Sequence, residues 1–318
     1  MFFLKLLRYL YKKIFPKRKL FFFSQKQPQS SGKTASDIIF NLLSQEKPCM
    51  ISRFGNTEFN CVSRYKIKND TLFKKYKKYI VGEIDTLDYS DKLKLEIKNN
   101  AGFFPTKDNY LDKFCEQMLN DIKNIDVLGS WLHVEENFKE ELKNAITVGL
   151  EDLNAYNHKE PWSKVLKEKK VLVIHPFVKS INQQYGRREQ LFNNKDILPD
   201  FDLITYKPVV SFAGNDVSLK YKSWFEALEK MKNDISKINF DIALIGCGAY
   251  GLPLASFVKE IGKKSVHLGG ATQMLFGIKG KRWETEYDLD HLFNEFWIRP
   301  SLEETPNNPN RVEKGCYW

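Results

Sequence analysis

Phe240-Asp-Ile-Ala-Leu-Ile-Gly-Cys-Gly-Ala-Tyr-Gly-Leu-Pro-Leu-Ala255 is the most informative stretch of the chain. The apolar run Ile242 to Ile245 predicts a buried strand, and Leu252 to Ile261 predicts a helix that Pro253 opens. Between strand and helix stand Gly246, Gly248 and Gly251. They predict a tight turn whose free amides, with the positive end of the helix dipole, favour an anion such as a pyrophosphate. We therefore expect a nucleotide or a phosphorylated donor as ligand.

The glycine pattern alone is a weak signal for NAD. A dinucleotide site needs a carboxylate about 20 residues on, at the end of the next strand, to hold a ribose hydroxyl. Here the next predicted strand, Ser265 to Leu268, contains His267 and ends in Gly269-Gly270, without a carboxylate. A nucleotide-sugar phosphate site fits this pattern better than NAD does, and a packing turn without a ligand is the remaining interpretation.

Strands and helices alternate over most of the chain. This order predicts an α/β fold with a mostly parallel, Rossmann-like sheet and helices on both faces. The predicted strands are 49–54, 125–128, 145–148, 171–174, 203–206, 242–245 and 265–268, and the clearest helices are 31–43, 178–192 and 218–236. We expect a single α/β domain over residues 32–300, followed by a Pro- and Asn-rich tail, 301–318, that wraps the surface or is disordered.

Unusual residues follow four of these strands. On parallel sheets, ligands bind beyond the carboxyl ends of the strands, so we expect the four loops to meet at one site. The loops read Arg53-Phe-Gly-Asn-Thr-Glu58, His175-Pro-Phe177, Gly246-Cys-Gly248 and His267-Leu-Gly-Gly270.

The N-terminal segment, residues 1–24, differs in composition from the rest. On a helix, Phe3, Leu7, Leu10 and Ile14 form an apolar face beside a stripe of cations, and Pro16 precedes the basic run 17–19 and the apolar run 20–23. The segment is too short and too charged to span a bilayer, which needs about 20 apolar residues. We expect a helix lying on an anionic membrane surface, with a first core helix as the alternative.

Composition narrows the function classes. The 318 residues carry a formal charge of +10, which suits phosphates, nucleic acid or an anionic membrane. The cations are not interleaved with aromatic residues on a groove-reading module, so we expect no nucleic-acid partner. The five cysteines, which include Cys247 in the glycine turn, form no C-x-x-C pair; this argues against a zinc site or a disulfide framework and favours a reducing cytoplasm.

Several segments resemble a known family. Ser52-Arg-Phe-Gly-Asn-Thr-Glu58 is similar to the Arg-Phe-Gly-Asp-Gly-Glu motif of the GT-D-fold glycosyltransferases of bacterial surface-polysaccharide and glycoprotein loci. The segments 171–177, 267–273 and 277–283 resemble a group of bacterial polysaccharide-biosynthesis proteins that we associate with that superfamily. The resemblance implies one α/β domain that transfers a sugar from a nucleotide donor to a growing glycan, with a D-x-E pair holding a divalent metal on the diphosphate.

This chain departs from that motif. Glu58 matches the second acid, Asn56 stands where the first Asp belongs, and Thr57 replaces the family's Gly. Because Asn offers a neutral oxygen, Glu58 and Asn56 should hold Mg²⁺ or Mn²⁺ more weakly, or the site should work without metal through cationic side chains on the diphosphate.

The candidate site residues follow from the loops and the resemblance. Glu58 is the expected catalytic carboxylate, ahead of Glu284 and Asp241, and His175 is a general base, a donor to phosphate or a structural histidine. For His267 a structural role is favoured. The predicted substrate-binding residues are Arg53, Gly55, Asn56, Arg187, Arg188, Gly246, Gly248, Gly251, Gly269, Gly270, Gln273, Lys279, Lys281 and Arg282.

The resulting hypothesis is a glycosyltransferase of bacterial surface-glycan synthesis. It would use a nucleotide-sugar donor and a glycan or lipid-linked acceptor, in the cytoplasm, peripherally on the inner face of the cell membrane. The alternatives are another nucleotide-using enzyme of the same pathways, such as a sugar-nucleotide oxidoreductase, and a non-catalytic assembly protein.

Overall fold

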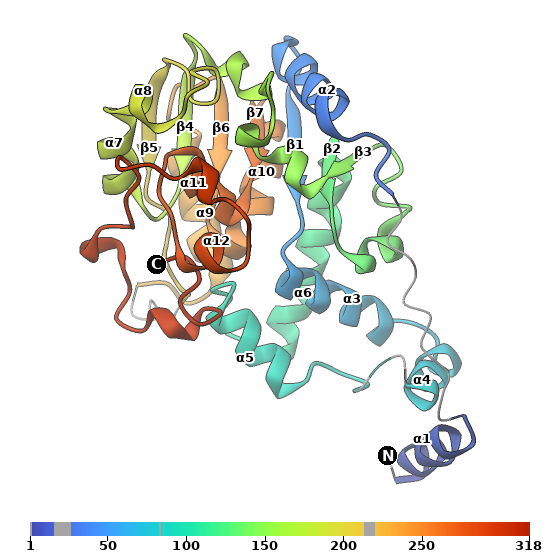
Figure 1. Ribbon diagram of the computed structural model, residues 1–318. Helices are drawn as coiled ribbons and strands as arrows, with labels where there is room; N and C mark the ends of the chain where they lie inside the picture. The colour runs from blue at the N-terminus through green and yellow to red at the C-terminus, as the bar shows by residue number, and fades with distance from the viewer. Residues whose placement is uncertain (1, 16–26, 83, 85, 213–219) are drawn as a thin grey trace.

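A single parallel sheet forms the centre of the molecule (Figure 1). The computed structural model describes residues 2–15, 27–82, 84, 86–212 and 220–318. In this part of the chain the sheet has seven strands in the order β3-β2-β1-β7-β6-β4-β5, and every neighbouring pair is parallel. The strands are β1 (Cys49–Arg53), β2 (Val127–Ser130), β3 (Ile146–Gly149), β4 (Lys170–Ile174), β5 (Asp202–Tyr206), β6 (Ile242–Ile245) and β7 (Lys264–His267). The predicted Rossmann-like α/β class is confirmed.

Helices cover both faces of this sheet. They are α1 (Phe2–Ile14), α2 (Gly32–Ser44), α3 (Asn56–Lys68), α4 (Leu72–Val81), α5 (Asp91–Asn99), α6 (Asp108–Asp121), α7 (Val178–Tyr185), α8 (Arg188–Leu191), α9 (Trp224–Ile235), α10 (Gly251–Glu260), α11 (Thr272–Leu275) and α12 (Lys281–Thr285). Helices α3, α5, α6, α9 and α10 pack on one face, and α2, α7, α8 and α11 pack on the other.

The strands are apolar on both sides because both faces are covered. In β4, Leu172 and Ile174 point to the face covered by α9 and α10, while Val171 and Val173 point to the opposite face, and all four are fully buried. Successive residues of a strand face opposite sides, so a doubly covered strand reads as a continuous apolar run. This is why the apolar runs in the sequence located the strands.

The connections between strands and helices open a crevice at the carboxyl edge of the sheet. The connections that leave β1 and β6 enter α3 and α10 on one face, whereas those that leave β4 and β7 enter α7 and α11 on the other face. Where adjacent strands send their chains to opposite faces, a crevice opens beyond their carboxyl ends. β1 and β7, β7 and β6, and β6 and β4 are such neighbours.

Two predicted helices differ from the observed ones. The predicted helix 178–192 is two pieces, α7 and α8, separated at Gly186-Arg187. The predicted helix 218–236 begins only at Trp224, where the Ser223 hydroxyl accepts a hydrogen bond from the Glu226 amide at 3.3 Å. Its first predicted residues, Ser218 and Leu219, lie outside the described residues.

The two ends of the chain lie at different parts of the molecule (Figure 1). Helix α1 packs on α4, away from the sheet, and the predicted basic run 17–19 and apolar run 20–23 lie outside the described residues. None of the described helices combines the length and apolarity needed to cross a bilayer.

The segment 301–318 is folded against the domain. Val312 and Cys316 are buried, and the intervening residues Glu313, Lys314 and Gly315 all have left-handed backbone, with φ of 43°, 61° and 82°. This tight turn directs the last residues back over the glycine loops at the carboxyl edge of the sheet. Of the two expectations for this segment, a wrapping tail or disorder, this packing corresponds to the first, and the surface that it covers is the candidate site.

Candidate functional site

The loops that follow β1, β4, β6 and β7 meet at the carboxyl edge of the sheet. A Cβ added to Gly246 would lie 2.4 Å from the carbonyl oxygen of Gly269 and 2.8 Å from Cδ2 of His175. A Cβ on Gly269, whose φ is +61°, would lie 3.1 Å from Nη1 of Arg53. The glycines therefore serve close approach of backbone to backbone and of backbone to guanidinium, which a larger residue would prevent.

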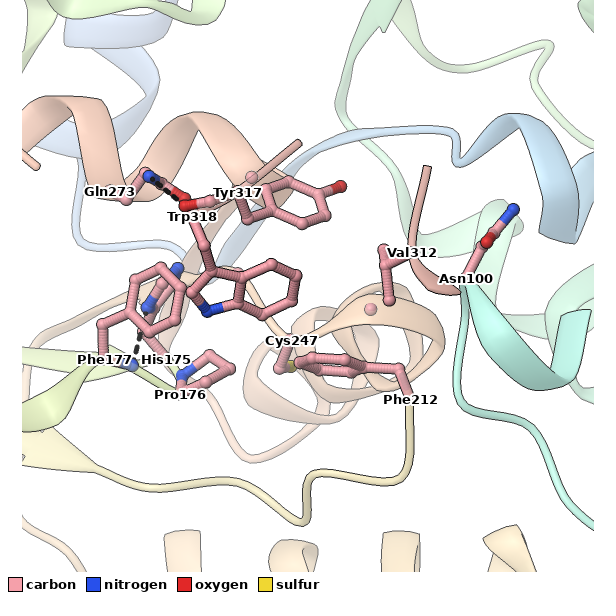
Figure 2. A pocket seen from close by; sticks show the side chains of 13 residues that line it. Asn100, His175, Pro176, Phe177, Phe212, Cys247, Gln273, Val312, Tyr317 and Trp318 are labelled. Atoms are coloured by element: carbon pink, nitrogen blue, oxygen red, sulfur yellow. Dashed lines mark hydrogen bonds between the residues drawn. The ribbon is translucent and has the colours of Figure 1, made fainter. Parts of the chain in front are cut away.

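Two adjoining pockets open at this edge. The first, which we call the aromatic pocket, has about 430 Å³ of empty space, counting the part open to solvent. Figure 2 shows His175, Phe177, Phe212, Cys247, Gln273 and Trp318 around it. The second, the arginine pocket, has about 560 Å³ counted in the same way, and its polar lining is Arg53, Glu151, Asn154, Tyr156, Arg282 and Tyr287. Gly270 and Tyr317 line both pockets.

Arg53 is the most unusual group of the arginine pocket. Its guanidinium carbon lies 4.9 Å from the ring centroid of Trp131, and its Nε is buried without a hydrogen-bond partner. Among the described residues, no carboxylate oxygen lies within ion-pair distance of it. Burial lowers the pKa of Arg53, the nearby Arg282 adds to this, and Tyr317 and Glu58 oppose it. A positive charge held here without a carboxylate partner is suited to an anionic ligand.

Arg282 brings a second guanidinium to the same pocket. It lies on α12, where its guanidinium carbon is 5.3 Å from the ring centroid of Tyr317 and its backbone amide donates to the Cys316 carbonyl. Its side chain forms ion pairs with Glu313 and Glu286. The C-terminal segment and α12 therefore fix each other, and together they place one wall of the pocket.

Glu58 lies at the N-terminal end of α3 and folds back over Gly55. A Cβ on Gly55 would lie 2.1 Å from Oε2 of Glu58, so only glycine leaves room for this carboxylate. Phe54 and Phe59 stack at 3.5 Å between ring centroids and fix the turn on both sides of it. Burial raises the pKa of Glu58, and its own backbone amide and Arg53 partly offset the rise. Glu58 lines neither pocket, but it stays electrostatically coupled to Arg53.

The residues at the N-T-E motif do not fit a divalent cation. Asn56 is exposed, and its Oδ1 accepts a hydrogen bond from the Asn60 amide at 3.2 Å. Glu58 is then the single carboxylate of the pair, and it lies beside the charge of Arg53. Across residues 2–15, 27–82, 84, 86–212 and 220–318, no three His, Cys, Asp or Glu side chains are grouped in a way that could hold a metal.

His175 is held in its neutral form. Its Nδ1 accepts a hydrogen bond from the Phe177 amide at 3.0 Å, so the ring proton is on Nε2. Burial lowers its pKa to about 3. Of the roles expected for His175, the donor of a hydrogen bond fits this geometry, and the general base does not, because the acceptor nitrogen is already bound.

Gln273 supports the aromatic pocket from α11. The side chain is fully buried; its Nε2 donates to the Ile278 and Tyr317 carbonyls at 3.2 Å each, and its Oε1 has no partner. A buried amide oxygen without a donor is costly unless a ligand or water supplies one. Figure 2 shows Gln273 bonded to the C-terminal segment at the pocket.

Two residues of the glycine and histidine loops have packing roles. His267 pairs its Nδ1 with the Ser52 hydroxyl at 3.0 Å, and a Cβ on Gly251 would lie 2.3 Å from its Nε2. The expected structural role of His267 fits this position. Gly251 lines neither pocket and instead lets α10 approach β7, which corrects its assignment as a substrate-binding glycine.

The turn before α10 is less open than a phosphate cradle requires. The Gly246 amide donates to the Ile174 carbonyl and the Ala249 amide to the Ala101 carbonyl, so two of its donors are used within the protein. Gly246, Cys247 and Gly248 still line the aromatic pocket. Cys247 is buried, and burial raises the pKa of its thiol, which favours the packing role over that of a nucleophile.

Four predicted cations lie elsewhere. Arg188 pairs at 2.8 Å with Asp200, two residues before β5 begins, and Arg187 precedes it directly, so both lie toward the amino edge of the sheet. Lys279 pairs with Glu284 at 3.6 Å, and the side chain of Lys281 is exposed; neither residue lines a pocket. Of the predicted cations, Arg53 and Arg282 are the two that the arginine pocket contains.

The weaker carboxylate candidates are also placed away from the pockets. Asp241 accepts a hydrogen bond from the Lys170 amide at 2.8 Å, at the amino edge, and Glu284 pairs with Arg299 and Lys279. Sequence reasoning missed a fourth carboxylate, Glu151, which follows β3 and lines the arginine pocket with Asn154 and Tyr156. The sequence could have indicated Glu151, because it follows the predicted strand 145–148 closely, just as Arg53 lies at the end of the predicted strand 49–54.

A scan against models of protein families, a search of curated proteins and a search of solved structures each find no match to this chain.

Proposed function

We propose that this protein transfers a sugar from a nucleotide-sugar donor to a bacterial surface glycan. The observation that carries the proposal is the arginine pocket, where Arg53 and Arg282 line one cavity and Arg53 has no carboxylate within ion-pair distance among the described residues. Arg53 supplies the unpaired positive charge, and Arg282, which is paired with Glu313 and Glu286, adds a second guanidinium fork whose geometry matches a phosphate group of a diphosphate.

The adjoining aromatic pocket supports a nucleotide as the carrier of that diphosphate. Phe212 and Trp318 lie with ring centroids 6.3 Å apart, and Phe177 lies 6.2 Å from Trp318 on another side. Flat apolar walls of this kind favour a planar base, and the Nε2 proton of His175 offers a hydrogen-bond donor in the pocket lining. Because both pockets share Gly270 and Tyr317, one extended ligand could occupy the two.

The chemistry assigned to these residues is electrostatic. In sugar transfer the bond between the anomeric carbon and the phosphate oxygen breaks, a new bond to the acceptor oxygen forms, and the acceptor hydroxyl loses its proton. The departing nucleoside diphosphate gains negative charge, which Arg53 and Arg282 would stabilise without a metal. A carboxylate would accept the proton of the acceptor hydroxyl as general base. Glu58, whose pKa is raised, is the candidate from the sequence, and Glu151 is the candidate within the arginine pocket.

A binding panel tests this proposal. The full chain is titrated by calorimetry with UDP, GDP, CDP, dTDP and NAD, each with EDTA and with Mn²⁺. We expect one nucleoside diphosphate to bind with EDTA present, and the matching nucleotide sugar to bind and to be consumed when a glycan acceptor is added. Tight binding of NAD alone would favour an oxidoreductase, and no binding at millimolar concentration would favour a non-catalytic assembly protein.

A further inference from the structure

Helices α1 and α4 form one surface at the end of the molecule opposite α2 (Figure 1). Arg8 of α1 donates to the Ile84 carbonyl at 2.6 Å, and its guanidinium carbon lies 4.8 Å from the ring centroid of Tyr79 on α4. Leu4, Leu7 and Tyr11 of α1 are partly buried. Helix α1 is therefore docked on α4, and each helix keeps an exposed face. We call these exposed faces the α1–α4 surface.

The α1 part of this surface is an apolar stripe. Phe3, Leu6, Leu10 and Ile14 are 66%, 43%, 42% and 66% exposed, at the spacing i, i+3, i+7 and i+11 of one helix face. The apolar face predicted from the sequence contained Leu7 and not Leu6. In the structure Leu7 is partly buried, and Leu6 takes its place in the exposed stripe.

Helix α4 adds apolar residues that the sequence analysis did not single out. The Thr71 hydroxyl accepts a hydrogen bond from the Lys74 amide at 3.4 Å and caps the helix, which leaves Leu72 and Phe73 at its exposed tip. They are 66% and 77% exposed. Burying these two side chains in an apolar medium would be favourable, by about 1.5–3 kcal/mol for each fully buried side chain.

The charge of both helices identifies the kind of partner. Each helix carries four cations and no carboxylate. Lys74 and Lys78 lie near Asp70, and Lys75 lies near Asp88. The remaining lysines, which have no ion-pair partner in the part of the chain that the structure describes, are Lys5, Lys12, Lys13 and Lys77. Two copies of such a surface would repel each other, whereas anionic headgroups would attract it.

We propose that α4 binds the surface of an anionic bilayer together with α1, with Leu72 and Phe73 inserted at the acyl boundary and the lysines on the headgroups. The surface is then built from two helices that come from separate parts of the chain, not from the N-terminal helix alone. Because α4 leads directly from α3, which begins at the candidate site, membrane binding would hold the domain in a fixed orientation. This inference does not depend on sugar transfer.

Vesicle sedimentation of the full chain tests the inference. We use phosphatidylcholine vesicles with and without about one third phosphatidylglycerol, and the variants Leu72→Ser/Phe73→Ser and Leu302→Ser. Leu302, which is 91% exposed and lies on neither helix, is the matched control. We expect binding to the anionic vesicles, a loss of at least about tenfold in partitioning for the double variant, and no change for the control.

A charge variant gives a second measure that does not depend on the apolar tip. Lys77→Glu should weaken binding to the same vesicles, and the effect should shrink as salt rises, because screening already reduces the attraction. Unchanged binding of Leu72→Ser/Phe73→Ser with α1 intact would overturn the role of α4. Equal binding to pure phosphatidylcholine would overturn the anionic partner. A dimer that the double variant abolishes, without vesicle binding by the natural chain, would replace the bilayer by a second copy.

Discussion

Acid should destabilise this protein through two buried histidines. His175 and His267 are buried, and the pKa of each is lowered to about 3, by burial for His175 and by burial and then Arg53 for His267. In the unfolded chain both titrate near 6.5. Below that pH the unfolded state binds more protons than the folded state, so the free energy of unfolding falls as pH falls from about 6.5 toward 3.

The expected size follows from this window. At pH 5.0 each histidine is about 1.5 pH units below its unfolded value, which removes about 2 kcal/mol of stability per histidine. We therefore expect His175→Gln and His267→Gln each to lose about 2 kcal/mol less than the natural chain between pH 7.5 and pH 5.0, whatever their stability at pH 7.5. Urea unfolding followed by tryptophan fluorescence measures the free energy of unfolding at each pH.

His291→Gln, which removes a histidine at an exposed position, is the matched control. If the histidine variants at 175 and 267 keep the natural pH dependence, then these rings titrate alike in both states. The neutral hydrogen-bond donor assigned to His175 would then be wrong.

Three further predictions concern the site and its packing. Gly251→Ala places a Cβ 2.3 Å from the His267 ring and should lower the free energy of unfolding by about 1–3 kcal/mol. Gly262→Ala meets nothing within 4 Å but has φ of +80°, so it reports the cost of backbone strain alone. Equal chemical shifts of the His267 ring in both variants would argue against the clash. Gly55→Ala should expel the Glu58 carboxylate from its position, 2.1 Å from the added Cβ, and should lower transfer as far as Glu58→Gln does; normal turnover of both variants would leave Glu151 as the carboxylate of the site. Tyr317→Ala should open the wall that separates the two pockets and change nucleotide affinity without a change in fold, and an affinity equal to that of the natural chain would place the ligand elsewhere.

The strands were predictable because burial on both faces makes each one a continuous apolar run. Arg53, Gly246 and Gly269 were predictable for a related reason: they end a strand or follow it within two residues, and the carboxyl edge of a parallel sheet positions them directly. The place of a residue directly at the end of a strand therefore follows from the local sequence.

Arg187 and Arg188 were expected at the candidate site but lie away from it, because helix α7 separates them from the end of β4. Helix α7 has eight residues, and at 1.5 Å of rise per residue it carries the chain about 12 Å back along the sheet, away from the edge where His175 lies. The wall formed by Tyr317 and Trp318 had no local signal at all. It depends on contacts with Gln273 and Arg282 that are more than 30 residues distant in the sequence, and on the left-handed turn at 313–315.

Arg53 is the residue on which diphosphate binding at the carboxyl edge of the sheet depends most. Calorimetric titration of Arg53→Gln and Arg188→Gln with the nucleoside diphosphate that the natural chain prefers measures this dependence. The two variants remove the same charge at opposite edges of one sheet. We predict an affinity at least about tenfold weaker for Arg53→Gln, the size expected for a charge-assisted hydrogen bond, and an unchanged affinity for Arg188→Gln. Equal affinities of both variants and the natural chain would show that Arg53 does not bind the diphosphate.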